Sequence, residues 1–107
     1  MASIEELADR VERVSAIYAE RCNINRDADW YALKLQEEAG ELVAEYLRGS
    51  GRGRTGDRSP EAIRTALENE AADLMAQLLL FCRNNAIDVE AALDSKWFVY
   101  LPESDRL

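Results

Sequence analysis

Carboxylates recur at helical spacing in two separate segments of the chain. Residues 35–45 read LQEEAGELVAE, and residues 70–80 read EAADLMAQLLL. On an α-helix with about 100° per residue, the glutamates of the first segment lie within an arc of about 100°, and apolar side chains take the opposite side. These glutamates are Glu37, Glu38, Glu41 and Glu45. A stripe of this kind on a single helix is usually a solvated face.

The second segment changes that interpretation. Residues 71–82 are almost all apolar around the whole circumference, and a narrow polar stripe of Glu70, Asp73 and Gln77 interrupts them. A helix that is apolar on all sides is expected to be buried. Buried carboxylates need a neutralising cation, and no Lys or Arg lies between Glu70 and Phe81. The two segments therefore predict a divalent metal site between facing helices.

The ligand types limit the metal and the reaction. The chain has no His, and Cys22 and Cys82 are far apart, which argues against zinc and favours a hard cation such as Mg²⁺. Several carboxylates around Mg²⁺, without His or a reactive Cys, favour phosphoryl or nucleotidyl transfer to water. A carboxylate beside that water can act as the general base.

Length and charge exclude other classes of protein. A chain of 107 residues is expected to be one domain, 1–107. Its core is small enough to suggest a partner subunit that covers exposed apolar faces. The net charge of −8 argues against a nucleic-acid partner. The first residues lack the pattern of a signal peptide, and no apolar run is long enough to span a bilayer. We expect a soluble, cytoplasmic protein without a membrane partner.

Hydrophobic periodicity and capping residues predict an all-α fold of four helices. Three are expected over residues 4–21, 30–48 and 60–84, and the fourth follows Asp88 toward Lys96 or Tyr100, before Pro102. Residues 49–59 read GSGRGRTGDRS and predict a flexible loop. Its arginines, Arg52, Arg54 and Arg58, leave two interpretations open: a plain linker, or a basic lid that contacts phosphate oxygens.

The two acidic motifs together resemble a known family. EExxE at residues 37–41 is followed on the next long helix by ExxD at residues 70–73. This order, across a Gly-rich loop and ahead of Lys96, resembles the MazG-like all-α nucleoside triphosphate pyrophosphohydrolases, over about residues 30–100. The superfamily also includes dimeric dUTPases and phosphoribosyl-ATP pyrophosphohydrolases. The resemblance implies a four-helix bundle-like MazG fold.

The resemblance also implies an activity and a set of site residues. The activity would be Mg²⁺-dependent hydrolysis of the α–β phosphoanhydride of a nucleoside triphosphate, in house-cleaning of nucleotide pools, with Mn²⁺ as a substitute metal. The metal ligands would be Glu38, Glu41, Glu70 and Asp73, and Glu37 and Glu38 would be catalytic. Glu37 would orient the attacking water or hold a further metal. Lys34 and Lys96 would bind phosphates, and Trp30 and Tyr100 would offer rings to the base.

Two other functions remain open at this stage. One is a non-catalytic helical oligomerisation module whose acids are solvated. The other is a phosphoribosyl-ATP pyrophosphohydrolase-like enzyme, which is disfavoured because those enzymes usually carry a His shortly after the ExxD acid and this chain has none. The apolar third helix and the short chain predict a homo-oligomer, with a dimer favoured over a tetramer.

Overall fold

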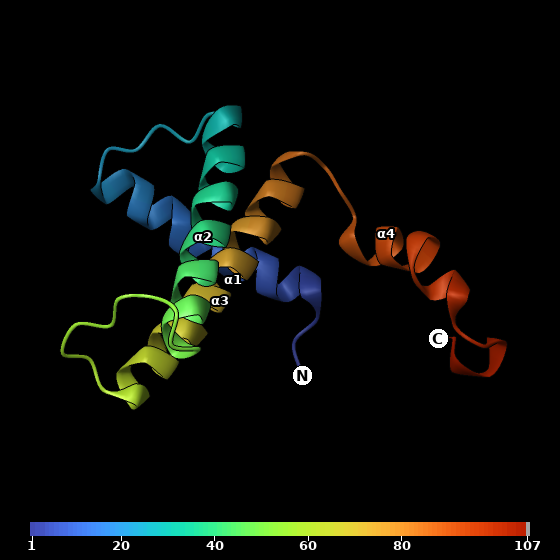
Figure 1. Ribbon diagram of the computed structural model, residues 1–107. Helices are drawn as coiled ribbons and strands as arrows, with labels where there is room; N and C mark the ends of the chain where they lie inside the picture. Colours follow the sequence, from blue (N-terminus) through green and yellow to red (C-terminus); the bar gives the residue numbers. More distant parts are fainter. Residues whose placement is uncertain (107) are drawn as a thin grey trace.

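The computed structural model describes residues 1–106, and 75% of the residues are helical (Figure 1). The predicted all-α class is confirmed, and no strand occurs within the described range. The elements in chain order are α1 (Ile4–Arg21), α2 (Ala28–Gly49), α3 (Pro60–Asn84), α4 (Val89–Lys96) and two short 3₁₀ turns, η1 (Phe98–Tyr100) and η2 (Glu103–Asp105).

Side-chain caps set where each α-helix begins. The Ser59 hydroxyl accepts a hydrogen bond from the backbone N–H of Ala62, and Pro60 opens α3. Asp27 caps α2 in the same way, so α2 begins at Ala28, two residues earlier than expected. Ser3 and Asp88 cap α1 and α4. The caps of Asp27 and Ser59 set where α2 and α3, the helices that carry the acidic residues, begin.

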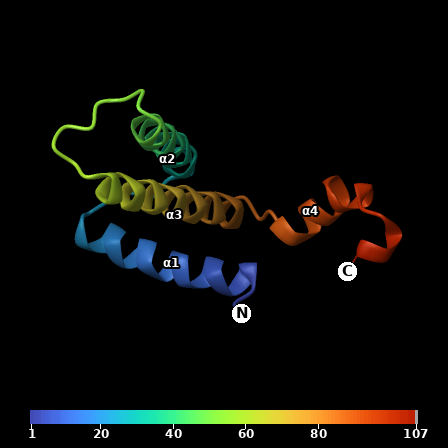
Figure 2. The same cartoon turned by 60° about the horizontal axis from the view of Figure 1, so that its bottom comes forward.

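Helix α3 lies between α1 and α2 (Figures 1 and 2). The loop of residues 50–59 reverses the chain, so α2 and α3 run antiparallel in close contact. Moving back along α2 from Glu41 therefore corresponds to moving forward along α3 from Glu70. This pairing brings the two acidic segments to the same level of the fold.

The fourth helix does not join the other three. It extends beyond the C-terminal end of α3, away from the body formed by α1, α2 and α3 (Figure 2). The helix also ends at Lys96, earlier than its furthest expected limit, and η1 continues the chain to Tyr100. After α4, the side chains of Trp97 and Tyr100 are largely exposed.

The core of the three-helix body is small. Its buried apolar residues are Ala19, Tyr31, Ile63, Leu79, Leu80 and Cys82. Helix α3 is not buried on all sides as predicted, since Met75 is 56% exposed and Leu78 is 39% exposed. With Ala71, these two side chains form an exposed stripe at spacings of four and three residues. Among residues 1–106, no helix combines the length and the apolar character needed to cross a membrane.

Candidate functional site

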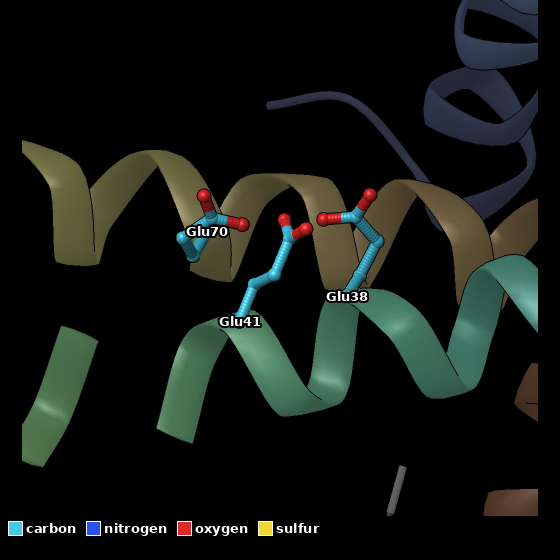
Figure 3. Close-up of side chains that lie close together, drawn as sticks. All are labelled: Glu38, Glu41 and Glu70. Atoms are coloured by element: carbon cyan, nitrogen blue, oxygen red, sulfur yellow. The ribbon is translucent and has the colours of Figure 1, made fainter. Parts of the chain in front are cut away.

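Three glutamates from the facing helices converge between α2 and α3 (Figure 3). Glu38 and Glu41 come from α2 and Glu70 from α3, and one carboxylate oxygen of each lies within 4.8 Å of those of the other two. We call these three residues the carboxylate cluster. The grouping follows from helical spacing, because residues three apart lie on neighbouring parts of one face.

Burial raises the pKa of two acids of the cluster, Glu38 and Glu70. Loss of hydration, together with the nearby charges of Glu41 and Asp73, raises the pKa of Glu38 to about 7. Burial also raises the pKa of Glu70, and the charge of Glu41 acts in the same direction. The Oε2 atoms of Glu38 and Glu70 are buried without a hydrogen-bond partner. Such groups cost free energy unless a cation or a donor meets them.

The donor set of the carboxylate cluster fits a hard divalent cation. All of its ligand atoms are carboxylate oxygens, which Mg²⁺ prefers, and two of the acids carry a buried oxygen with no protein partner. With metal–oxygen distances of about 2.0–2.1 Å, opposite ligands of Mg²⁺ stand about 4.2 Å apart. The observed spacing of no more than 4.8 Å is close to that value, so small side-chain rotations suffice.

Asp73, the fourth predicted ligand, lies beside the cluster but outside the group within 4.8 Å. It is exposed, and its charge reaches both Glu38 and Glu70 strongly enough to raise their pKa values. It stands three residues after Glu70 on the same helix, which keeps it on the same face. Asp73 is therefore placed to complete the donor set from the cavity side.

Lys34 lies next to the cluster, one turn before Glu38 on α2. Its Nζ is 2.9 Å from Glu37 Oε2 and 3.8 Å from Glu38 Oε1, and the hydrogen bond to Glu37 raises the pKa of the lysine. Glu37 is about half exposed and lies outside the carboxylate cluster, at the edge of the site. Its partner is thus Lys34.

A cavity of about 720 Å³ opens beside the carboxylate cluster, between α1, α2 and α3. Its size is in the range typical of small-molecule sites. Trp30, Lys34, Glu38 and Asp73 all line it, so four of the predicted site residues share one cavity. Trp30 also packs edge-on against the buried ring of Tyr31, with 5.0 Å between the ring centroids. The polar lining further includes Arg10, Ser15 and Gln77.

Helix α1 contributes more to this cavity than its sequence suggested. Sequence reasoning did not select Arg10 or Ser15, because the periodicity of α1 indicated packing alone. Arg10 follows Leu7 by three residues and precedes Val14 by four, so it belongs to the face that lines the cavity. The spacing of Arg10 from these two apolar residues is the sequence feature that indicates its place on the cavity face. Ser15 accepts a hydrogen bond from Arg26, whose guanidinium also pairs with Glu12 at 2.8 Å.

Two predicted substrate-binding residues lie away from the cavity. Lys96 ends α4 and Tyr100 ends η1, on the part of the chain that leaves the three-helix body. Lys96 is exposed, and Tyr100 is 86% exposed. Neither lines the cavity. Within a single chain the structure does not bring them to the acids, because α4 extends beyond the C-terminal end of α3 and away from the three-helix body.

The glycine-rich loop is anchored to a different acid. Glu45, the last glutamate of the α2 stripe, is buried and lies outside the carboxylate cluster. Arg48 Nη1 is 2.6 Å from Glu45 Oε1, and Arg58 Nη1 is 3.3 Å from the same atom. Arg52 stacks over Tyr46 at 5.5 Å. The loop arginines thus hold the loop against the end of α2, and the structure favours the linker interpretation over the basic lid.

No protein-family model, curated protein or solved structure matches this chain.

Proposed function

We propose that the protein is a Mg²⁺-dependent nucleoside triphosphate pyrophosphohydrolase. It converts a (deoxy)nucleoside triphosphate and water to the monophosphate and pyrophosphate, in house-cleaning of nucleotide pools. The observation that carries the proposal is the carboxylate cluster, in which two buried oxygens lack a protein partner beside a cavity large enough for a nucleotide.

Each residue has a role that follows from its position. The carboxylate cluster, with Asp73, would hold Mg²⁺, with Mn²⁺ as a substitute; bound there, the metal neutralises charge on the phosphates. Lys34 lies beside Glu38 and donates to phosphate oxygens. Trp30, on the cavity wall, offers its ring to the base. Glu37, at the edge of the site, orients the attacking water and accepts its proton.

The reaction balances with these groups alone. A water oxygen forms a bond to the α-phosphorus while the bond from that phosphorus to the α–β bridging oxygen breaks. Pyrophosphate leaves with the bonding electron pair, and Glu37 takes the proton of the water. Because the carboxylates cannot approach a polyphosphate without a cation between them, we expect no turnover in the absence of a divalent metal.

The assembly we propose is a cytoplasmic homodimer, with a tetramer as the alternative. The exposed stripe of Ala71, Met75 and Leu78 on α3 is the surface that a second copy would cover. Lys96 and Tyr100 fit the proposal only if α4 of one copy lies over the cavity of the other.

Product analysis tests the function. The full chain is incubated with Mg²⁺ and a panel of canonical and modified NTPs and dNTPs, and monophosphate plus pyrophosphate is resolved from diphosphate plus phosphate. We expect monophosphate and pyrophosphate only. Glu38→Gln should lower kcat/KM by about 100-fold or more, since even residues that merely orient metal ligands contribute about 10–100-fold.

Glu68→Gln is the matched control. Glu68 is exposed on α3, and its 3.8 Å pair with Arg64 is solvent-accessible, so its loss should leave activity within about twofold of wild type. Diphosphate as the product would overturn the assigned bond. If no nucleotide is hydrolysed and Mg²⁺ leaves the melting temperature unchanged, the chain is the oligomerisation module, which the exposed apolar stripe of α3 also suits.

A further inference from the structure

Gln77 is a polar residue of the cavity to which the proposed reaction gives no role. It lies on α3 four residues after Asp73, on the same face, and lines the same cavity as Trp30 and Lys34. Its Oε1 is buried and accepts no hydrogen bond. A buried amide oxygen is normally paired, so an unpaired one beside an open cavity indicates a ligand that supplies the donor.

The chemistry of this atom narrows the ligand group. A carboxamide oxygen only accepts hydrogen bonds, so its partner must carry an O–H or N–H. The ionised phosphates of a nucleotide offer neither. Its sugar offers hydroxyl groups, and its base offers ring or amino N–H groups. The unpaired oxygen of Gln77 therefore suits the nucleoside part of a nucleotide rather than its polyphosphate.

The order of residues along the cavity distinguishes sugar from base. Gln77 is one helical turn, about 6 Å, beyond Asp73, whereas Trp30 is eight residues, about 12 Å, before Glu38 on the antiparallel α2. From the acids outward, the cavity therefore presents Gln77 first and Trp30 second. A nucleotide presents its α-phosphate, then its sugar, then its base in the same order.

The other polar groups of the cavity are less suited than Gln77 to accept a hydrogen bond from a sugar hydroxyl. The hydroxyl oxygen of Ser15 already accepts a hydrogen bond from Arg26 at 3.1 Å. Lys34 and Arg10 are donors only and suit phosphate oxygens. The acids Glu38 and Asp73 belong to the metal end of the cavity.

We propose that the Gln77 carboxamide oxygen accepts a hydrogen bond from a sugar hydroxyl of the nucleotide and makes Gln77 the residue that discriminates between sugars. The inference rests on the proposed function for its substrate. It predicts that removing the hydroxyl from the substrate and removing the amide from the protein have the same, non-additive effect.

The test combines four substrates with three proteins. For the base that the wild-type protein binds best, kcat/KM is measured for the ribo, 2′-deoxy, 3′-deoxy and 2′,3′-dideoxy triphosphates. The proteins are wild type, Gln77→Met, which preserves chain length without the amide, and Gln36→Met, the same change at an exposed position of α2 outside the cavity. Calorimetric Kd values for the corresponding monophosphates with Mg²⁺ give a readout that needs no turnover.

Wild type and Gln36→Met should lose about 5- to 100-fold in kcat/KM when the contacted hydroxyl is absent. In Gln77→Met, kcat/KM for the substrates with and without that hydroxyl should differ by less than about twofold. For the dideoxy substrate, kcat/KM should be the same in Gln77→Met as in wild type. Loss confined to the 2′-deoxy or to the 3′-deoxy substrate identifies the hydroxyl.

Three results would overturn the inference. They are a wild-type protein indifferent to all four sugars, an equal loss on every substrate in Gln77→Met, and a changed base preference with the sugar ratio intact. Monophosphate binding that depends on both the hydroxyl and Gln77, without hydrolysis of any triphosphate, would support the inference and refute only the proposed reaction. Absence of both binding and turnover would overturn the two together.

Discussion

Burial governs the behaviour of Glu38. Its pKa in the folded chain is about 7, against an ordinary value of 4.5, mainly because the carboxylate loses hydration. Between those two pH values the folded chain holds a proton that the unfolded chain has released. The free energy of unfolding of the metal-free protein should therefore be highest near pH 5 and fall as the pH rises through about 7.

Melting temperatures measured in EDTA from pH 5 to pH 8 test this expectation. Glu38→Gln cannot ionise, so it should flatten the decline and stabilise the metal-free protein at pH 8. Part of the fall in melting temperature with pH should remain in that variant, because the pKa of Glu70 is also raised. The Glu68→Gln control should retain the full wild-type slope. A wild-type stability that rises between pH 5 and pH 8 would contradict the burial argument.

The sequence predicted the acids that share a face but not the partner of each acid. Glu38, Glu41 and Glu70 were predicted together because helical periodicity is a local property. Glu37 is the neighbour of Glu38 in the sequence, so its side chain leaves the helix about 100° away from that of Glu38. Glu37 is half exposed there and pairs with Lys34. Glu45 was grouped with the other glutamates, yet its partner Arg58 is 13 residues away. Helical periodicity carries no information about such a contact.

At the level of elements, the ion pairs of Glu45 connect the loop of residues 50–59 to α2. Arg58→Ala leaves Glu45 buried with Arg48 as its remaining partner. We expect the free energy of unfolding to fall by about 1 kcal/mol, between the values for exposed and fully buried pairs, because the Arg58 side chain is 37% exposed. Backbone amides of residues 50–58 should exchange with solvent faster, as hydrogen-exchange measurements would detect.

The kinetics of nucleotide hydrolysis should not depend on the contacts that the loop arginines make. Because the loop arginines contact Glu45 and Tyr46 rather than the carboxylate cluster, kcat/KM of Arg58→Ala should stay within about twofold of wild type. Arg54→Ala is the control for stability, since Arg54 binds Arg48 through its backbone carbonyl, which the substitution preserves. A loss of activity in Arg58→Ala with unchanged stability would restore the lid interpretation.

Element boundaries were the most predictable feature of the fold. Ser3, Asp27, Ser59 and Asp88 each bond a backbone N–H three residues ahead, so a short window of sequence contains the whole interaction. The position of α4 was not predictable in the same way. The position of α4 depends on which surface covers Trp97, Tyr100 and the exposed stripe of α3. The pattern of apolar residues in a sequence shows that a face is to be covered but not what covers it.

At the scale of the whole molecule, the small core and the exposed α3 stripe predict self-association. Met75→Lys places a charge on that stripe and should raise the dissociation constant of the dimer at least about 10-fold. Sedimentation velocity at micromolar concentration should find wild type as a dimer and Met75→Lys largely as a monomer. Thr65→Lys, at an exposed polar position of α3, should remain dimeric. A monomeric wild-type protein would contradict the proposal.

A dimer also determines how Lys96 can take part in the reaction. Because α4 projects away from the cavity of its own chain, Lys96 can contact substrate if it reaches the cavity of the partner. Lys96→Ala and Glu38→Gln should then each be nearly inactive alone and restore activity when mixed. In the mixed dimer one site carries both substitutions and the other carries none.

The expected recovery has a definite size. Random exchange of equal amounts makes half of the dimers mixed, and half of the sites in those dimers intact, so about a quarter of wild-type activity should return. The subunits are mixed, given time to exchange, and assayed for pyrophosphate release. If Lys96 served the site of its own chain, every site in the mixed dimer would carry one substitution and no activity would return. Mixing Glu38→Gln with Glu70→Gln is the negative control, because both acids belong to the carboxylate cluster of a single chain and each site still lacks one of them.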